Sequence, residues 1–132
     1  MRYMLMMHAP RGTGDYAVKA WTPDDLKAHI GFMHSLNQEL TTSGELVRAE
    51  GLAPPGQAKV VKAGRNGEPT VTDGPFVQAK EFLTGFWIVD VASEARAHEI
   101  AARASSAPGP GGQPMGIPIE VRQVMSAPPV DG

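Results

Sequence analysis

The stretch LTGFWIVDV, Leu83–Val91, sets the architecture because it has the pattern of a β-strand with two apolar faces. Side chains alternate between the two faces of a strand. The alternating sets are Leu83, Gly85, Trp87, Val89 and Val91 on one face, and Thr84, Phe86, Ile88 and Asp90 on the other. The opening run Met1–Met7 is apolar on both faces in the same way. A sheet of such strands needs an apolar partner on each side, since soluble monomers avoid large exposed hydrophobic patches.

Two amphipathic helices are predicted, one before this strand and one after it. The first begins at Thr22-Pro23-Asp24-Asp25, where threonine can cap the helix, proline suits its first position and the aspartates complement its dipole. Ser43-Gly44 ends it. The second helix runs from its cap, Ser93, to Ser105. The apolar faces at helical spacing are Leu26, Ile30, Met33, Leu36 and Leu40 in the first helix, and Ala97, Ile100, Ala101 and Ala104 in the second.

The remaining segments predict short strands. Their expected ranges are 1–7, 46–52, 59–63, 69–72, 83–91 and 117–125, with Gly64–Gly67 as the turn of a hairpin. Two helices on a mainly antiparallel sheet predict an α+β sandwich of ferredoxin-like type. Because two helices cover only one face of the sheet, we expect a second copy of the chain to cover the other, which makes the protein a homodimer.

Composition limits the classes of function. The 132 residues predict one domain over 1–125, followed by a flexible tail at 126–132. Twelve basic and 14 acidic residues give a net charge of -2 without a basic patch, so no nucleic-acid partner is expected. The chain has no cysteine, which excludes disulfides and thiolate metal sites. With no signal peptide and no membrane span in the pattern, we expect a cytoplasmic protein with no membrane partner.

Short motifs around the central strand carry a resemblance to a known family. They are Asp73-Gly74-Pro75-Phe76, Lys80-Glu81, Gly85-Phe86, Val89-Asp90-Val91, Gly44-Glu45-Leu46, Gly51-Leu52 and Ile119-Glu120-Val121-Arg122. In this order they resemble the DGPF family of YCII-related proteins. The resemblance implies a dimeric α+β barrel of ferredoxin-like subunits. Some YCII-related proteins look like small lyases or dehalogenating enzymes that rely on a His–Asp pair, and others are associated with extracytoplasmic-function sigma factors. The sequence departs from the family in its Gly/Pro-rich loop 108–116 and in His8.

Asp73 has two open interpretations. Its side chain can bond nearby backbone N–H groups in a turn, where Gly74 supplies a conformation that other residues resist and Pro75 fixes the next angle. Alternatively, the same rigid turn holds a carboxylate at the rim of a site, with Phe76 as its anchor in the core. Lys80 either shares that site as a substrate-binding residue or is a solvated charge before the strand.

Three further groups are candidates for the same site. His29 lies within the apolar stripe of the first helix and is the candidate general base, although a hydrogen-bonded core histidine is the simpler explanation. His8 is the second candidate, because the first and last strands are neighbours in a ferredoxin-like sheet. His8, Glu120 and Arg122 can therefore gather on its open face, either as an intersubunit ion pair or as a pocket for a small anion.

Two hypotheses of function follow from the sequence. The first is a cofactor-free small-molecule enzyme, with Asp73 and a histidine moving protons in an elimination or hydrolysis. The second is a dimeric binding or accessory module without catalysis, for example one linked to an extracytoplasmic-function sigma factor. No metal site is expected, because no two histidines lie four residues apart on a helix. The RGTGD segment lacks both the dinucleotide and the phosphate-loop fingerprints.

Overall fold

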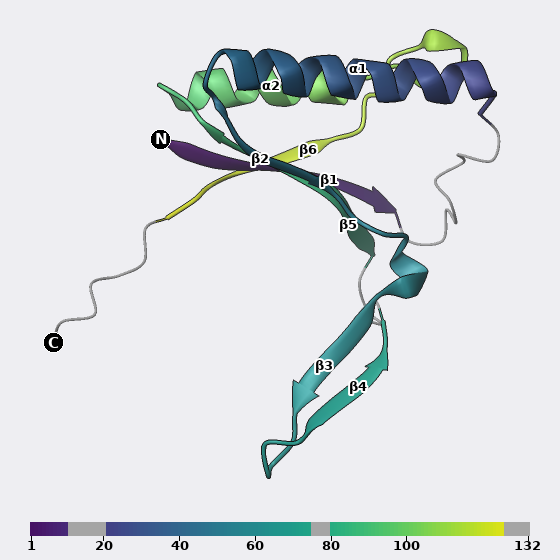
Figure 1. Ribbon diagram of the computed structural model, residues 1–132, viewed down its shortest axis with the longest axis vertical. Coiled ribbons are helices and arrows are strands. Elements are labelled where there is room, and N and C mark those ends of the chain that lie inside the picture. The colour runs from purple at the N-terminus through teal and green to yellow at the C-terminus, as the bar shows by residue number, and fades with distance from the viewer. Residues whose placement is uncertain (11–20, 75–79, 126–132) are drawn as a thin grey trace, which may run out of the picture.

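The computed structural model describes residues 1–10, 21–74 and 80–125 (Figure 1). Within them the elements are β1 (Arg2–Pro10), α1 (Pro23–Thr42), β2 (Leu46–Gly51), β3 (Lys59–Ala63), β4 (Pro69–Asp73), β5 (Glu81–Asp90), α2 (Glu94–Ser105) and β6 (Ile119–Gln123), with short 3-10 helices at Pro55–Gln57 and Pro110–Gly112. The predicted elements are present, with ends that differ by up to three residues. The expected tail 126–132, and Pro75 and Phe76 of the turn, lie outside the described residues.

The main sheet has four antiparallel strands in the order β2-β5-β1-β6. α1 joins β1 to β2, and β5 lies between these two strands in the sheet. α2 joins β5 to β6, and β1 lies between them. This is the split β-α-β arrangement of ferredoxin-like folds. Both helices lie on the same face of the sheet (Figure 1). The α+β prediction is confirmed, and the topology is compatible with a ferredoxin-like fold. No helix in the described ranges is long and apolar enough to cross a bilayer.

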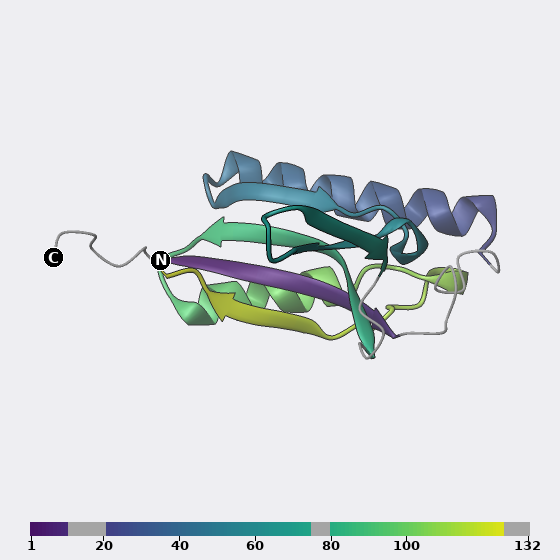
Figure 2. The same cartoon turned by 90° about the horizontal axis from the view of Figure 1, so that it is seen from below.

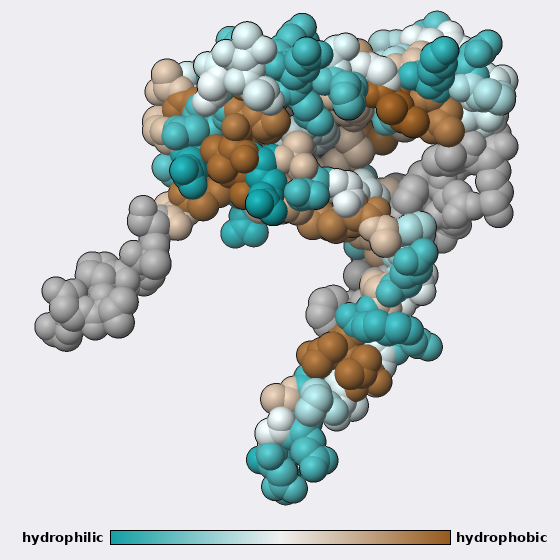
Figure 3. Space-filling view, in the orientation of Figure 1, coloured by the Kyte–Doolittle hydropathy of each residue, from teal (hydrophilic) through white to brown (hydrophobic). Residues whose placement is uncertain are grey.

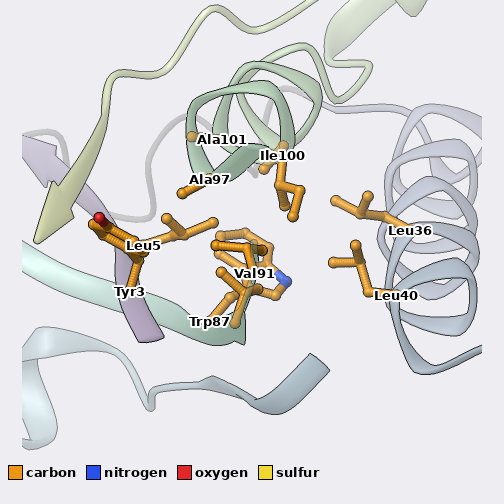
Figure 4. Packing of buried hydrophobic residues seen from close by; sticks show 11 residues of the cluster. Tyr3, Leu5, Leu36, Leu40, Trp87, Val91, Ala97, Ile100 and Ala101 are labelled. Atoms are coloured by element: carbon orange, nitrogen blue, oxygen red, sulfur yellow. The ribbon is translucent and has the colours of Figure 1, made fainter. Parts of the chain in front are cut away.

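The core lies between this face and the helices. Leu5 and Val89 from the sheet, Leu36 from α1 and Ile100 from α2 have almost no exposed surface. Figure 4 shows Leu36 and Leu40 pointing from α1 toward Ile100 and Trp87. Small residues of α2 let this helix approach the sheet closely; they are Ala97, Ala101 and Ala104.

α1 has the ends that its sequence predicts. The Thr22 hydroxyl accepts from the Asp25 N–H at 3.1 Å, and the Asp25 carboxylate accepts from the Thr22 N–H at 3.2 Å, which completes a capping box. The expectation that its whole apolar stripe faces the core is wrong for the first half. Leu26 is 38% exposed and Ile30 is 56% exposed, because this part of α1 extends past the end of the sheet (Figure 1).

The face of the sheet away from the helices is apolar in the middle. Met4 pairs with Ile88 and Met6 with Phe86, and all four side chains are only partly buried. We call these four residues the open-face strip. Trp87, between Phe86 and Ile88, lies on the core face and is 6% exposed. The prediction that the central strand is apolar on both faces is therefore confirmed.

β3 and β4 form a separate two-stranded ribbon that stands away from the sheet, on the side opposite the helices (Figures 1 and 2). Gly67, with φ of 80°, makes its tight turn, as the Gly64–Gly67 signal predicts. Gly74 follows the ribbon, and its N–H donates to the Ala58 carbonyl at 2.8 Å. Gly74 does not have a positive φ. The prediction that it supplies a backbone conformation that other residues resist is therefore wrong. A β-carbon here would instead lie 3.1 Å from Val60 Cγ2 and 3.2 Å from the Ala58 oxygen.

Candidate functional site

The structure brings together His8 and Glu120. Glu120 pairs with Met6 across β1 and β6, and His8 follows two residues later on the same face. His8 Nε2 lies 3.2 Å from Glu120 Oε1, with side chains 27% and 54% exposed. Arg122 pairs with Met4 on this face and is exposed, without a bonded partner among the described residues. A carboxylate beside an imidazole is an arrangement that orients a histidine for proton transfer.

Asp73 lies elsewhere, at the end of β4. Lys59 Nζ donates to its Oδ1 at 2.6 Å across the ribbon, and the Asp73 side chain is 89% exposed. Lys80, just before β5, is exposed, and no other described residue bonds its ammonium. The predicted cleft joining Asp73 to the histidines stays a prediction, because the intervening residues 75–79 lie outside the described ranges.

His29 contacts the Gly/Pro-rich loop. Its Nδ1 lies 3.0 Å from the Pro108 carbonyl oxygen, which can only accept, so Nδ1 carries the proton. Trp21 makes an edge contact with the ring at 5.2 Å between centroids. The same loop bonds α1 again where the Gly111 N–H donates to Asp25 Oδ1 at 3.2 Å. His29 thus has the partner that a histidine on this stripe requires.

A cleft that the sequence did not reveal lies between α1 and the sheet, and we call it the α1 cleft. Its volume is about 240 Å³. The lining residues are Met7 from β1, Met33 and Asn37 from α1, Ala49, Glu50 and Gly51 from β2, and Thr84, Gly85, Phe86 and Trp87 from β5. None of the six predicted site residues is among them. The surface of the lining is mostly apolar, with thioether and aromatic groups that suit a flat apolar molecule.

The local backbone of β5 leaves room for this cleft. The pairing of β1 with β5 shifts between Met7 and His8, so Thr84 has no opposite residue, and its hydroxyl donates to the Met7 carbonyl at 3.0 Å. Such a bulge re-aims the side chains beside it. Gly85 comes next, and a β-carbon there would lie 3.0 Å from the Glu50 oxygen. The glycine therefore permits close approach of β2 and keeps a side chain out of the cleft.

Asn37 is a polar group of the cleft whose orientation is fixed. Trp87 Nε1 donates to Asn37 Oδ1 at 2.8 Å. An indole N–H only donates, so the amide oxygen must face it. The amide nitrogen, Nδ2, then has no acceptor among the described residues. In the sequence, Asn37 stands out as a second polar residue on the apolar stripe of α1, and that was the available signal for this site.

Away from the cleft, an ion pair joins the exit of α1 to α2. Arg96 donates from Nε to Glu45 Oε2 and from Nη2 to Oε1, both at 2.9 Å. These bonds hold the pKa of Glu45 below its usual value, against the opposing effect of burial. The same contact raises the pKa of Arg96. Among the described residues no three His, Asp or Glu side chains gather as metal ligands would.

Comparison with known proteins identifies the family. The YCII-related domain matches residues 1–109, most of the chain. The protein belongs to the YCII-related family. DGPF is another name for it, so the resemblance that the motifs carry is confirmed. The chain is also 29% identical over 103 residues to the uncharacterized protein R00369 of Rhizobium meliloti (strain 1021), with 77% of this chain and 82% of that protein covered. The family match ends before Glu120, so it includes only one member of the His8–Glu120 pair.

Proposed function

We propose that this YCII-related protein is a homodimer that binds a small, mostly apolar molecule in the α1 cleft of each subunit. The observation that carries the proposal is Asn37, whose amide oxygen bonds Trp87 while its amide nitrogen keeps two donors for a ligand. Ligand sites of this type combine an apolar lining with a few placed polar groups. The volume of about 240 Å³ lies below the range of about 300–1,000 Å³ typical of drug-sized ligands, so the molecule is small.

The chemistry of the lining defines the ligand class. Met7, Met33 and Trp87 favour an aromatic or otherwise flat ring. Asn37 Nδ2 favours a carbonyl or ether oxygen as acceptor on that ring. The described residues that line the cleft include no Lys, Arg or His, so a carboxylate bound there would lack a cationic partner. We therefore expect a neutral aromatic carbonyl compound to bind better than a carboxylate of the same size.

The open-face strip supports the dimer. No helix of the described residues covers its four apolar side chains, and charged residues of the outer strands lie on either side. These are Arg48 and Glu50 on β2, and Glu120 and Arg122 on β6. A second sheet packed on this strip removes the apolar surface from water and leaves the charges at the rim, as in other protein interfaces. Two such subunits, each with its cleft on the helical side, would make the dimeric α+β barrel that the family resemblance implies.

Acetophenone and ethylbenzene test the cleft, because they share a ring and differ in the carbonyl. Binding is monitored by the fluorescence emission of Trp87 in a Trp21→Phe background, in which Trp87 is the remaining tryptophan. Acetophenone should bind more tightly than ethylbenzene. Asn37→Asp keeps an acceptor for Trp87 Nε1 and removes the amide donor. It should therefore weaken the binding of acetophenone by about tenfold, the contribution of one hydrogen bond. Gln38→Glu makes the same chemical change on the exposed side of α1 and should have no effect.

Equal binding of the two probes, or equal weakening by the two variants, would show that the cleft is not a carbonyl site. The fold of each variant is checked by its thermal melt. Because Asn37→Asp retains the hydrogen bond to the indole, loss of binding with an unchanged melt separates recognition from stability.

A second candidate function, proton-transfer catalysis, is favoured by the 3.2 Å contact between His8 and Glu120. On a dimer this pair borders the open face, where Glu120 orients the imidazole as a general base for a cofactor-free elimination or hydrolysis. Small lactones and halogenated aromatic acids are suitable test substrates. His8→Gln should reduce any turnover by about 10²–10⁴-fold. The matched control is His98→Gln, since His98 also has a glutamate neighbour but lies on the surface of α2. Turnover that survives in His8→Gln excludes this role.

A role beside an extracytoplasmic-function sigma factor stays a prediction of the sequence alone. The same is true of catalysis through Asp73 with His29, and of substrate binding by Lys80.

A further inference from the structure

The ribbon formed by β3 and β4 has one apolar face that the rest of the described chain leaves uncovered. Residues opposite each other in an antiparallel pair share a face. One face carries the pairs Lys59–Asp73, Val61–Val71 and Ala63–Pro69, and the other carries Val60–Thr72 and Lys62–Thr70. Val61 is 63% exposed and Val71 is 59% exposed. Figure 3 shows the hydrophobic patch halfway along the ribbon.

A ribbon of this kind needs a partner to stay ordered. Two-stranded hairpins are at best marginally stable in water, and they gain stability when they pack on another element. Among the described strands, β3 and β4 pair with each other and not with the main sheet, and Figure 1 shows the ribbon standing away from the sheet on the side opposite the helices. The pair Val61–Val71 is therefore suited to a surface outside this subunit.

We infer that the ribbon is an arm that packs its Val61–Val71 face on the body of a second copy of this chain. The inference rests on the homodimer proposed above. The ribbon stands on the open-face side of the sheet (Figure 1). Its five-residue strands are about 17 Å long, whereas stacked sheets lie about 10 Å apart. An arm longer than the gap between two stacked sheets reaches the second sheet and lies against it.

The symmetry of such a dimer doubles the contact. In a two-fold dimer each subunit presents the same surfaces, so the arm of each subunit packs on the body of the other. Each arm adds a buried Val61–Val71 pair beside the open-face strip, continuous with the proposed interface. The ion pair of Lys59 with Asp73 at the base of the same face then lies next to the contact, where it fixes the pairing of the two strands.

Neighbouring lysine substitutions on opposite faces of β4 test the arm. Val71→Lys places a charge on the apolar face, and Thr70→Lys places the same charge on the other face. Sedimentation equilibrium gives the dimer dissociation constant of each. Val71→Lys should raise it by about tenfold or more, since two valines are lost from each dimer. Thr70→Lys should change it by no more than about twofold, as other surface substitutions do.

Hydrogen exchange of the parent protein provides a test without substitutions. The backbone amides of β3 and β4 should exchange more slowly at concentrations above the dimer dissociation constant than below it. A parent that stays monomeric overturns both the dimer and the arm. The arm alone is overturned if the ribbon of the dimer exchanges as fast as that of the monomer, or if Val71→Lys does not weaken the dimer. The Val61–Val71 face would then be a contact surface for a different protein.

Discussion

The ion pair of Glu45 with Arg96 connects the segment after α1 to α2, and Glu45→Gln measures its contribution to stability. The side chains are 18% and 35% exposed, so the pair is neither fully solvated nor fully buried. A hydrogen bond to a charged group contributes about 1.5–3 kcal/mol, and an exposed ion pair about 0–1 kcal/mol. Glutamine keeps one acceptor oxygen and loses the charge. We expect Glu45→Gln to lower the free energy of unfolding by about 1–2 kcal/mol at pH 7.

The pH dependence of this difference follows from the lowered pKa of Glu45. A carboxyl with a lower pKa in the folded state stabilises the fold above its unfolded pKa of about 4.3. That stabilisation is lost as the pH falls through the folded pKa. Glutamine does not titrate, so the difference between parent and variant should be complete at pH 7 and shrink below about pH 4.3.

Urea unfolding at a fixed protein concentration measures both effects, since a dimer makes stability depend on concentration. The control is Glu99→Gln. Glu99 accepts one bond from Arg96 Nη1 at 3.0 Å and is 65% exposed, so its loss should cost no more than about 0.5 kcal/mol. A Glu45→Gln penalty that is the same at pH 3 as at pH 7 would refute the assignment to the charged pair. Equal penalties for Glu45→Gln and Glu99→Gln would refute it as well.

Two further predictions concern the sheet and the ribbon. If the protein is the proposed dimer, Phe86→Asp should convert it to a folded monomer by light scattering, whereas Trp87→Asp should unfold the chain, because Phe86 lies on the open face and Trp87 in the core. A Phe86→Asp variant that stays dimeric at micromolar concentration would contradict the proposed interface. Gly74→Val should cost about 1–3 kcal/mol, since its β-carbon would press on Val60 and the Ala58 carbonyl. A thermal melt equal to the parent's would show that this space can open.

Much of the fold was predictable from local signals. The capping residues Thr22 and Ser93 locate the starts of α1 and α2, and Gly44 marks the end of α1 with its φ of 81°. The alternation in β5 identifies its two faces, and the double apolar pattern indicates that each face needs an apolar partner, of which α1 and α2 supply one. These signals depend on a few neighbouring residues, so the sequence displays them directly.

The candidate site was less predictable, because it depends on distances between distant segments. The pairing of His8 with Glu120 could be expected, since strand neighbours and alternation determine which side chains share a face. The α1 cleft could not be expected in the same way. It arises where the bulge at Thr84 and the glycines of β2 and β5 leave space under α1, and nothing in the spacing of these residues shows that empty volume. Asn37 was visible only as a polar residue that needed a partner.

The uneven attachment of α1 has a consequence for how the proposed ligand would enter the α1 cleft. Leu36 and Leu40 fix the second half of the helix to the core, whereas the first half is held to the loop 108–116 through His29 and Asp25. Met33 lies at the boundary between the two halves and lines the cleft. Local opening of the first half breaks a few hydrogen bonds at the surface and exposes little new apolar area, since Ile30 is already 56% exposed. If the cleft binds a ligand as proposed, the first half of α1 is the part of the helix that can move away to admit it, while Leu36 and Leu40 keep the second half packed in the core.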